Sequence, residues 1–483
     1  MKRKPTMSDI LGEIVSLDLE KIDLNDKEAI RRLIQKLLNI IEMQAKIIAD
    51  MERENQNLKD EINRLKGEKG RPQIKPNVPR KENDLPQEKK RSKKWKKTGK
   101  KQRIKIDKTE TLRVDPAILP PDAEHKGYRT VVVQNIRFET ENTEYRLERY
   151  YSPCEQKLYE AELPEEVDGE FGAELKAFVH YLYFACRVPE EKIWRILTER
   201  GIIISKGQIS NILTKDRQEE FSREKEGILE AGMACSDYFH IDDTGARHKG
   251  VNHYLHVICN SLFSAFFIKP RKNRDTIKEI LGLNEEELME KIMISDDAKQ
   301  FLFVAALHAL CWLHEIRHYR KMSPFLESHR AKLIDFLTEV WEFYEMLKEY
   351  KKSPDDGQKL FLERRFDELF STETGYEELD RRISLTREKK DRLLLVLTYP
   401  QIPLHNNPAE IAVREFVIKK KISYGTRSKE GRIAWENMMS ILDTCRKQGV
   451  SFLEYVTNIY SGHNMPRLAE LIMQKGSAKP TSY

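Results

Sequence analysis

A heptad repeat between residues 28 and 66 restricts the fold of this chain more than any other sequence feature. One column of the repeat holds Ile34, Ile41, Ile48, Asn55 and Ile62, and the other holds Leu37, Gln44, Met51, Leu58 and Leu65. Isoleucine in the first column with leucine in the second favours two parallel helices, and a lone asparagine such as Asn55 fixes their register. We therefore predict a coiled-coil region at 1–70 that makes the protein a homodimer. A single amphipathic helix packed on its own chain is the alternative.

A basic linker is expected at residues 71–110, because prolines at 72, 76, 79 and 86 block helix continuation. Between Lys89 and Lys105, eleven of seventeen residues are basic and none is acidic, a pattern that suits contact with DNA phosphates. An aromatic ring within this run offers a surface on which a base can stack. The candidate DNA-binding residues here are Lys93, Lys94, Trp95, Lys96 and Lys97. A solubilising linker or a localisation tag remains the alternative.

Length and composition favour a protein of several domains that stays in the cytoplasm, associated with the nucleoid. With 483 residues the chain exceeds one ordinary core. Its longest apolar run, 301–313, contains His308 and is shorter than the roughly 20 residues of a membrane span, so no membrane partner is expected. The six cysteines are widely spaced without a CxxC pair, so neither a disulfide framework nor a self-contained zinc finger is expected.

The middle of the chain predicts a small β module followed by helices. Residues 129–160 alternate in strand fashion with a turn at Glu141–Asn142, which places a β module at 111–165. Helical stretches are expected within 166–230, at 174–186, 189–200 and 205–214. The last two resemble a helix-turn-helix with Ser205 as N-cap, although two short helices joined by a turn occur in many α-rich proteins. The side chains expected to reach DNA from it are Lys206, Gln208 and Asn211.

Acidic pairs follow two of the strands expected after residue 236. One strand, 238–241, ends at Asp242, strands at 254–260 and 265–268 follow, and 292–294 leads into Ser295-Asp296-Asp297. This order suits a mixed sheet with helices on its faces, in which active groups gather where strands end. We therefore expect Asp242 and Asp296 to converge on a metal ion.

A third acid, Glu410, has two interpretations. With Asn407 as N-cap and Pro408 as the first helical residue, Glu410 is the third residue and serves as a capping-box carboxylate. Alternatively, the helix start fixes Glu410 as a metal ligand beside bound phosphate. Basic residues that follow would then supply counter-charge for DNA, and they are Lys419, Lys420, Lys421 and Arg427. The spacing alone leaves both interpretations open.

Four motifs in order carry a family resemblance. They are Asp242-Asp243-Thr244, Ser295-Asp296-Asp297, the run from Cys311-Trp312-Leu313-His314 to Tyr319, and Asn406-Asn407-Pro408-Ala409-Glu410 with Arg414. Together they resemble the insertion sequence 66 family of bacterial transposases. The resemblance implies a multidomain, mostly α protein with an α/β RNase H-like core. That core would comprise residues 231–320 and 401–465, with a helical insertion at 321–400 and a tail at 466–483.

The resemblance also implies an activity, that of a DDE transposase. Asp242, Asp296 and Glu410 would be the catalytic, metal-binding triad for two Mg²⁺ ions, for which Mn²⁺ can substitute. Such an enzyme cleaves the ends of its element and joins the freed 3′ hydroxyl to target DNA. Its partners would be double-stranded DNA at transposon ends and target, with accessory proteins of the same element. Residues expected to support the active site are Cys311, His314, Arg317, Asn406 and Asn407.

The sequence also departs from the family. Relatives carry a cysteine-rich zinc-binding segment where this chain has only Cys154, while Ile411 and His405 replace the usual arginine and aspartate. Cys311 and His314 lie three apart on one helix face, too few ligands for a zinc site. Two other functions therefore stay open: a dimeric DNA-binding protein whose acids are structural, and an RNase H-like nuclease that cuts without joining.

Overall fold

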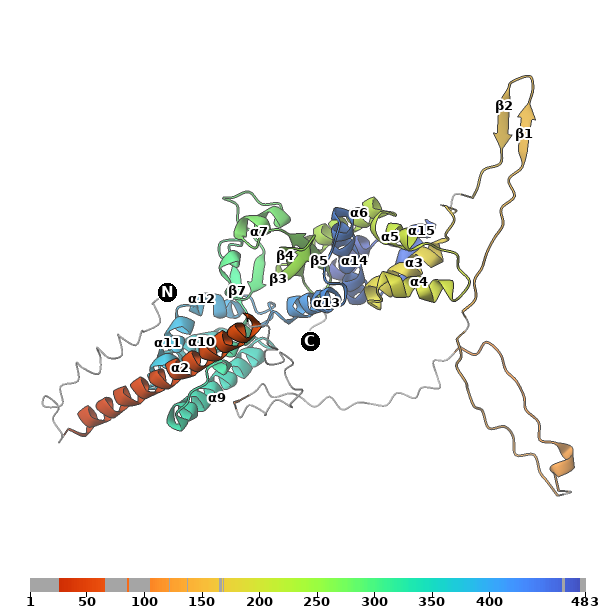
Figure 1. Cartoon of the computed structure of the whole chain (residues 1–483). Helices are drawn as coiled ribbons and strands as arrows, with labels where there is room; N and C mark the ends of the chain where they lie inside the picture. The colour runs from red at the N-terminus through yellow and green to blue at the C-terminus, as the bar shows by residue number, and fades with distance from the viewer. Residues whose placement is uncertain are drawn as a thin grey trace.

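The computed structural model describes residues 26–65, 85–86 and 105–477, apart from 121, 137, 165–166, 168 and 463–464. The basic run with Lys93, Lys94, Trp95, Lys96 and Lys97 lies outside these residues. A mixed sheet forms the centre, with helices on its faces, a long N-terminal helix beside a group of helices at one end, and an extended hairpin projecting at the other (Figure 1). Among the described residues, no helix is long and apolar enough to cross a membrane.

The described helices fall into three groups along the chain. The N-terminal helix is α2 (Lys27–Leu65), and those before the sheet are α3 (Ala173–His180), α4 (Glu190–Thr198), α5 (Lys206–Thr214) and α6 (Gln218–Ala234). Between and after the strands come α7 (Arg274–Leu281), α8 (Trp312–Arg320), α9 (Glu327–Tyr350), α10 (Asp356–Leu369), α11 (Glu377–Arg387) and α12 (Lys390–Leu393). The last group is α13 (Asn407–Ser423), α14 (Lys429–Gln448), α15 (Phe452–Ser461) and α16 (Leu468–Ser477). Ser205 caps α5 as predicted, since its side chain accepts the N–H of Gln208 at 3.1 Å.

The sheet confirms the predicted mixed α/β architecture. Its strands are β3 (Tyr238–His248), β4 (Val251–Cys259), β5 (Ser264–Lys269), β6 (Ile292–Ser295) and β7 (His308–Leu310), in the order β5-β4-β3-β6-β7. β4 is antiparallel to both β3 and β5, whereas β6 is parallel to β3 and β7 is parallel to β6. One prediction was wrong: β3 does not end at Asp242 but continues six residues further, because its second half pairs with β4 as a hairpin.

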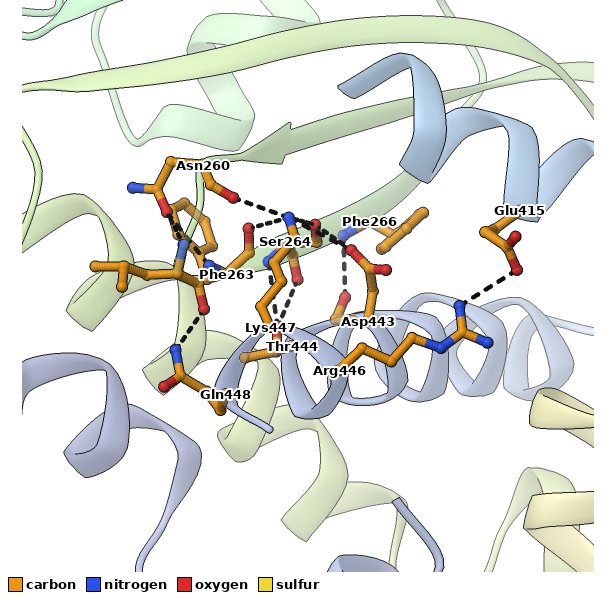
Figure 2. A network of polar contacts seen from close by, with 12 residues as sticks. Asn260, Phe263, Ser264, Phe266, Glu415, Asp443, Thr444, Arg446, Lys447 and Gln448 are labelled. Carbon is orange, nitrogen blue, oxygen red and sulfur yellow. Dashed lines mark hydrogen bonds and ion pairs between the residues drawn. The ribbon is translucent and has the colours of Figure 1, made fainter. Parts of the chain in front are cut away.

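Helix α14 covers the free edge of β5, as Figure 2 shows for part of the interface. Alternate N–H groups of the strand donate to helix side chains spaced four residues apart: Ser264 N to Thr444 Oγ1 (3.2 Å), Phe266 N to Ser440 Oγ (3.0 Å) and Ile268 N to Glu436 Oε1 (3.1 Å). The spacings match, because four helical residues rise about 6 Å and two strand residues about 6.6 Å. The helix thus satisfies the edge donors, and the sheet cannot extend on that side.

Two hydrophobic clusters contact this sheet. One joins the sheet to α3–α6 and α14–α16, and the other joins β6 and β7 to the helices between residues 312 and 397. The second cluster includes the mostly helical stretch expected at 321–400. Helix α2 lies against these helices through Glu42, whose carboxylate accepts the N–H groups of Phe325 (2.7 Å) and Leu326 (2.9 Å) before α9.

The β module expected at 111–165 is much smaller than predicted. Its strands are β1 (Arg149–Ser152) and β2 (Lys157–Glu160), an antiparallel hairpin whose turn lies at residues 153–156. The turn predicted at Glu141–Asn142 is wrong, since those residues lie in irregular, exposed backbone. Val131, Val133 and Ile136 of the strand-like alternation are exposed, and pairing between strands is limited to the short hairpin.

Candidate active site

Asp242 lies within one strand, and Asp296 directly follows the neighbouring parallel strand. The parallel pairing of β3 with β6 ends with His240 opposite Ile294. Asp242 lies two residues after His240 and is still within β3. Asp296 lies two residues after Ile294 and is the first residue beyond β6. Because paired parallel strands advance together, the two acids occupy equivalent positions at the same level of the sheet.

Each acid that follows these two is neutralised by its own partners. Asp243 forms an ion pair with Lys272, and its second oxygen accepts a hydrogen bond from Gln300 Nε2 at 2.7 Å. Asp297 pairs with Lys389 at 2.8 Å and with Arg392 at 2.9 Å. Although burial alone would raise it, these two cations lower the pKa of Asp297. Asp243 and Asp297 are therefore each held by cationic partners of their own.

Asp242 and Asp296, by contrast, accept hydrogen bonds from nearby backbone. Asp242 Oδ1 accepts the N–H of Asp243 at 2.8 Å, and Asp296 Oδ1 accepts the N–H of Ala298 at 3.1 Å. Within the described residues, neither acid forms a salt bridge with lysine or arginine. Burial, followed by the charges of Asp296, Asp243 and Glu410, raises the pKa of Asp242 to about 7. Burial likewise raises the pKa of Asp296. Gathered acids that lack a counter-ion are the usual ligands of a hard divalent cation.

The start of α13 excludes the capping-box interpretation of Glu410. The N-cap is Asn406, not Asn407 as predicted, so Glu410 is the fourth helical residue rather than the third. Its carboxylate faces α8 instead: Oε1 lies 3.5 Å from His314 Nδ1, and Oε2 lies 3.4 Å from an Arg317 nitrogen. Glu410 therefore points away from its own helix terminus and toward the other site residues. Asn407 is the half-buried first residue of α13.

Asn406 joins three elements of the site. Its Nδ2 donates to the carbonyl of Ile241 at 2.9 Å, and its Oδ1 lies 2.9 Å from His240 Nδ1, both on β3 just before Asp242. Burial lowers the pKa of His240 to about 4, so the ring is neutral and Nδ1 carries the proton that Oδ1 accepts. The backbone N–H of Asn406 donates to Cys311 Sγ at 3.2 Å. This fully buried asparagine thus fixes α13, and with it Glu410, against the strand that carries Asp242.

Cys311, His314 and Arg317 all reach this site from the first turns of α8. Cys311 is the buried N-cap residue of the helix, and burial raises the pKa of its thiol to about 11. Burial, together with the charge of Arg317, lowers the pKa of His314. Among the described residues, one group of three potential ligands has its ligand atoms all within 4.8 Å of one another, and it consists of Cys311, His314 and Glu410.

Three residues around the acids were not predicted from the sequence. His240, Lys272 and Gln300 contact Asn406 or Asp243 from positions with no motif of their own. The only sequence signal was for His240, which lies two residues before Asp242 and therefore on the same face of β3. Lys272 follows β5 and Gln300 follows β6, so only the folded sheet brings them to Asp243.

Of the residues expected to bind DNA from the helix-turn-helix-like region, some already contact other side chains of the protein. Lys206 forms an ion pair with Glu191 at 2.5 Å and lies 4.7 Å from the centre of the Trp194 ring, which ties α5 to α4. Gln208 is half-buried, whereas Asn211 is exposed. Lys206 and Asn211 are thus the exposed side chains of the three.

The basic residues on and after α13 differ sharply in exposure. Lys421 and Arg427 are exposed, and Lys420 donates to the carbonyl of Gly245 at 2.5 Å. The prediction that Lys419 contacts DNA is wrong, because this residue is 1% exposed. Its amine donates to the carbonyl of Tyr183 at 2.9 Å and lies 3.5 Å from the centre of the Tyr183 ring. Burial lowers its pKa to about 7. A buried amine of this kind cannot reach a phosphate at the surface, so Lys419 is not a DNA contact.

Comparison with known proteins defines the class. The family model described as "Transposase IS66 family" matches residues 168–433, a span that includes β3, β6, α8 and the start of α13. This span is more than half of the chain. The chain therefore belongs to the IS66 family of transposases.

A curated relative is similar over a shorter region. An "Uncharacterized protein y4jO" of Sinorhizobium fredii (strain NBRC 101917 / NGR234) is 38% identical over 190 residues, or 39% of this chain. The match covers 59% of the relative's own length. Its name assigns no activity.

Proposed function

We propose that this protein is a DDE transposase whose catalytic acids are Asp242, Asp296 and Glu410 on an RNase H-like core. The observation that carries the proposal is the convergence of these carboxylates from β3, from the end of β6 and from α13, as the raised pKa of Asp242 reflects. The mixed sheet and the family membership support the same function. Transposon ends and target DNA are the proposed substrates.

The residues present suit a pair of divalent ions, with Mg²⁺ as the natural choice and Mn²⁺ as its substitute. Asp242 and Asp296 lack a cationic partner within the described part of the chain, and Glu410 Oε1 is buried without a hydrogen bond. Carboxylate oxygens are the ligands that Mg²⁺ prefers. When bound, the metals would activate the attacking oxygen and stabilise the leaving oxygen of a phosphodiester.

The chain's own side chains have defined tasks in such a reaction. Asn406 fixes the distance between α13 and β3, so that Glu410 is held in place before DNA binds. Arg317, which is 45% exposed at its side chain, offers a positive charge beside Glu410 for a phosphate. Water attacks the scissile phosphodiester first, and the released 3′ hydroxyl then attacks target DNA in a second displacement.

The test is a cleavage and strand-transfer assay with purified full-length protein, Mg²⁺ and DNA carrying the ends that flank its gene. Both nicked ends and joined products are expected. Cleavage without joining would identify a nuclease instead. DNA binding without any product, after accessory proteins of the element are added, would identify a DNA-binding protein whose acids are structural.

The proposal includes a homodimer formed through α2. The apolar residues of both heptad columns are exposed along this helix, between 40% for Leu37 and 80% for Leu65. The opposite side of α2 is already occupied: Asn39 and Glu42 are 7% and 2% exposed against the helices near α9 and α11. A second copy of the same helix is the partner that this repeat fits, with Asn55 paired across the axis.

Replacing Ile48 and Leu58 together by glutamate is expected to convert the dimer into a monomer. Each side chain would lose about 1.5–3 kcal/mol of burial at the interface and would bring a charge into it. Light scattering on a size-exclusion column gives the mass. Asn57→Glu, on the outer side of the same helix, serves as the control and should stay dimeric. A double variant that keeps twice the monomer mass would contradict pairing through this seam.

The exposed basic residues on and after α13 predict a measurable salt dependence of DNA binding. Replacing Lys421 and Arg427 by alanine should reduce the slope of log Kobs against log salt by about 1 for each phosphate that these side chains neutralise. Lys419→Met is the matched control, because that amine is buried and its removal should leave the slope unchanged. Fluorescence anisotropy between low and moderate salt measures the slopes. Equal slopes for all three proteins would remove these residues from the DNA interface.

A further inference from the structure

We propose that Cys311, His314 and Glu410 form a binding site for a zinc-class divalent transition metal, Zn²⁺ or Co²⁺. The sulfur, imidazole nitrogen and carboxylate oxygen all lie within 4.8 Å of one another, although α8 and α13 are far apart in sequence. Three protein ligands with a free fourth position are the arrangement of many catalytic zinc sites. The sequence offered only two of these ligands, and the fold supplies the third.

Two polar atoms of this group lack hydrogen-bond partners among the described residues. Within the part of the chain that the structure describes, His314 Nδ1 and Glu410 Oε1 are buried without a hydrogen bond, and they face each other at 3.5 Å. Buried polar atoms without partners are costly, so their convergence on one point indicates a ligand that would bond to both. A thiol and an imidazole nitrogen are soft ligands, which favour Zn²⁺ or Co²⁺ over Mg²⁺.

The surroundings orient each ligand. Glu410 Oε2 faces Arg317 at 3.4 Å, which leaves Oε1 directed toward His314. Cys311 Sγ accepts the N–H of Asn406 at 3.2 Å and lies at the N-terminus of α8. On metal binding the thiol proton would leave to solvent.

Sharing Glu410 would couple this site to catalysis. A soft metal held by Cys311 and His314 would take Glu410 away from the Mg²⁺ site, so Zn²⁺ would inhibit DNA cleavage. This consequence rests on the proposed role of Glu410 in transposition. Metal binding itself requires only the three side chains, and it can be tested without DNA.

The experiment is a titration of the metal-free, full-length protein with Co²⁺, followed by the sulfur-to-cobalt charge-transfer absorption. We expect this band to saturate at one Co²⁺ per chain and to vanish in Cys311→Ser, which can keep the hydrogen bond from Asn406. His314→Gln should weaken binding by more than the roughly 10- to 100-fold that loss of an outer partner costs. Cys154→Ser, which removes an exposed thiol on the β1–β2 hairpin, is the control and should keep the band.

Two outcomes would overturn the site: a wild-type protein without the band, or a band that survives in Cys311→Ser. Circular dichroism of each variant separates loss of the ligand from loss of the fold. Mg²⁺-dependent cleavage by a protein without the cobalt band would contradict this site and leave the transposase proposal intact. The band without any cleavage would support the metal site and contradict the proposed activity.

Discussion

Asp242→Asn and Glu410→Gln are each expected to reduce DNA strand cleavage by on the order of 10³-fold or more, about 4 kcal/mol in activation free energy. Each change removes a carboxylate from the acids that lie together between β3, β6 and α13. Binding of transposon-end DNA should remain within a few-fold of wild type, because neither residue belongs to the exposed basic surface. Single-turnover cleavage and fluorescence anisotropy measure the two properties separately.

The neighbouring acids provide matched controls for this result. Asp243→Asn and Asp297→Asn remove the same group one position away, but those carboxylates are held by Lys272 and by Lys389 with Arg392. Both variants should retain most cleavage activity. If Asp243→Asn were as inactive as Asp242→Asn, the assignment of the first metal ligand would be wrong by one residue. Full activity in Glu410→Gln would return that residue to a structural role.

The strands that carry the acids could be predicted from sequence because each is a short apolar run. β6 was expected at 292–294 and spans Ile292–Ser295. The length of β3 could not be predicted, because residues 242–248 are mostly polar and are held mainly by pairing with β4. β7 was missed as well, since His308 interrupts its apolar pattern; in the fold His308 Nε2 lies 2.7 Å from Ser295 Oγ.

The interpretation of Glu410 from sequence depended on where its helix begins, and sequence places such a boundary only to within a residue or two. Asn406 and Asn407 are both good N-caps, so local rules could not choose between them. The choice is made by tertiary contacts: Asn406 bonds to His240 and Ile241, which precede it by 166 and 165 residues. Such long-range bonds leave no periodic pattern in a single sequence.

A run of basic residues led to a wrong prediction for a similar reason. Lys419, Lys420 and Lys421 form a continuous basic triplet, which is typical of a solvated helix face. Consecutive helical residues point about 100° apart, so one of the three turns inward, where Tyr183, Phe184 and Trp435 surround the Lys419 amine. The aromatic residues that bury it come from η4 (Tyr181–Ala185) and α14, which only the fold brings together.

The cluster of acids also predicts a trade-off between activity and stability in the metal-free protein. The pKa of Asp242 rises from 3.8 to about 7 on folding, chiefly because of burial and then because of the neighbouring acids. The folded protein therefore binds this proton more tightly than the unfolded chain does. The stabilising contribution is complete below pH 3.8 and is lost as the pH rises through about 7.

Asp242→Asn is accordingly expected to be more stable than wild type at pH 8 in the presence of a chelator. The gain in free energy of unfolding has an upper bound of about 4 kcal/mol, because each unit of pKa difference corresponds to about 1.4 kcal/mol. The gain should shrink toward zero near pH 4. Urea midpoints of the two proteins, followed by tryptophan fluorescence at both pH values, give the difference. An equal difference at the two pH values would show that the effect comes from packing rather than from ionisation.

Asp297→Asn supplies a control of opposite sign. The cations Lys389 and Arg392 lower the pKa of Asp297, so its carboxylate stabilises the fold above pH 3.8 and loses that effect as the pH falls. Its replacement should therefore destabilise the protein at pH 8 and matter less at low pH. If both variants behave as expected, the Asp242 carboxylate lowers the stability of the metal-free protein, whereas the Asp297 carboxylate raises it. A residue that lowers stability is expected where function requires it, and Asp297 then has a structural role.

Adding Mg²⁺ should stabilise the wild type at pH 8 more than Asp242→Asn, because only the wild type has the full set of acids to bind the metal.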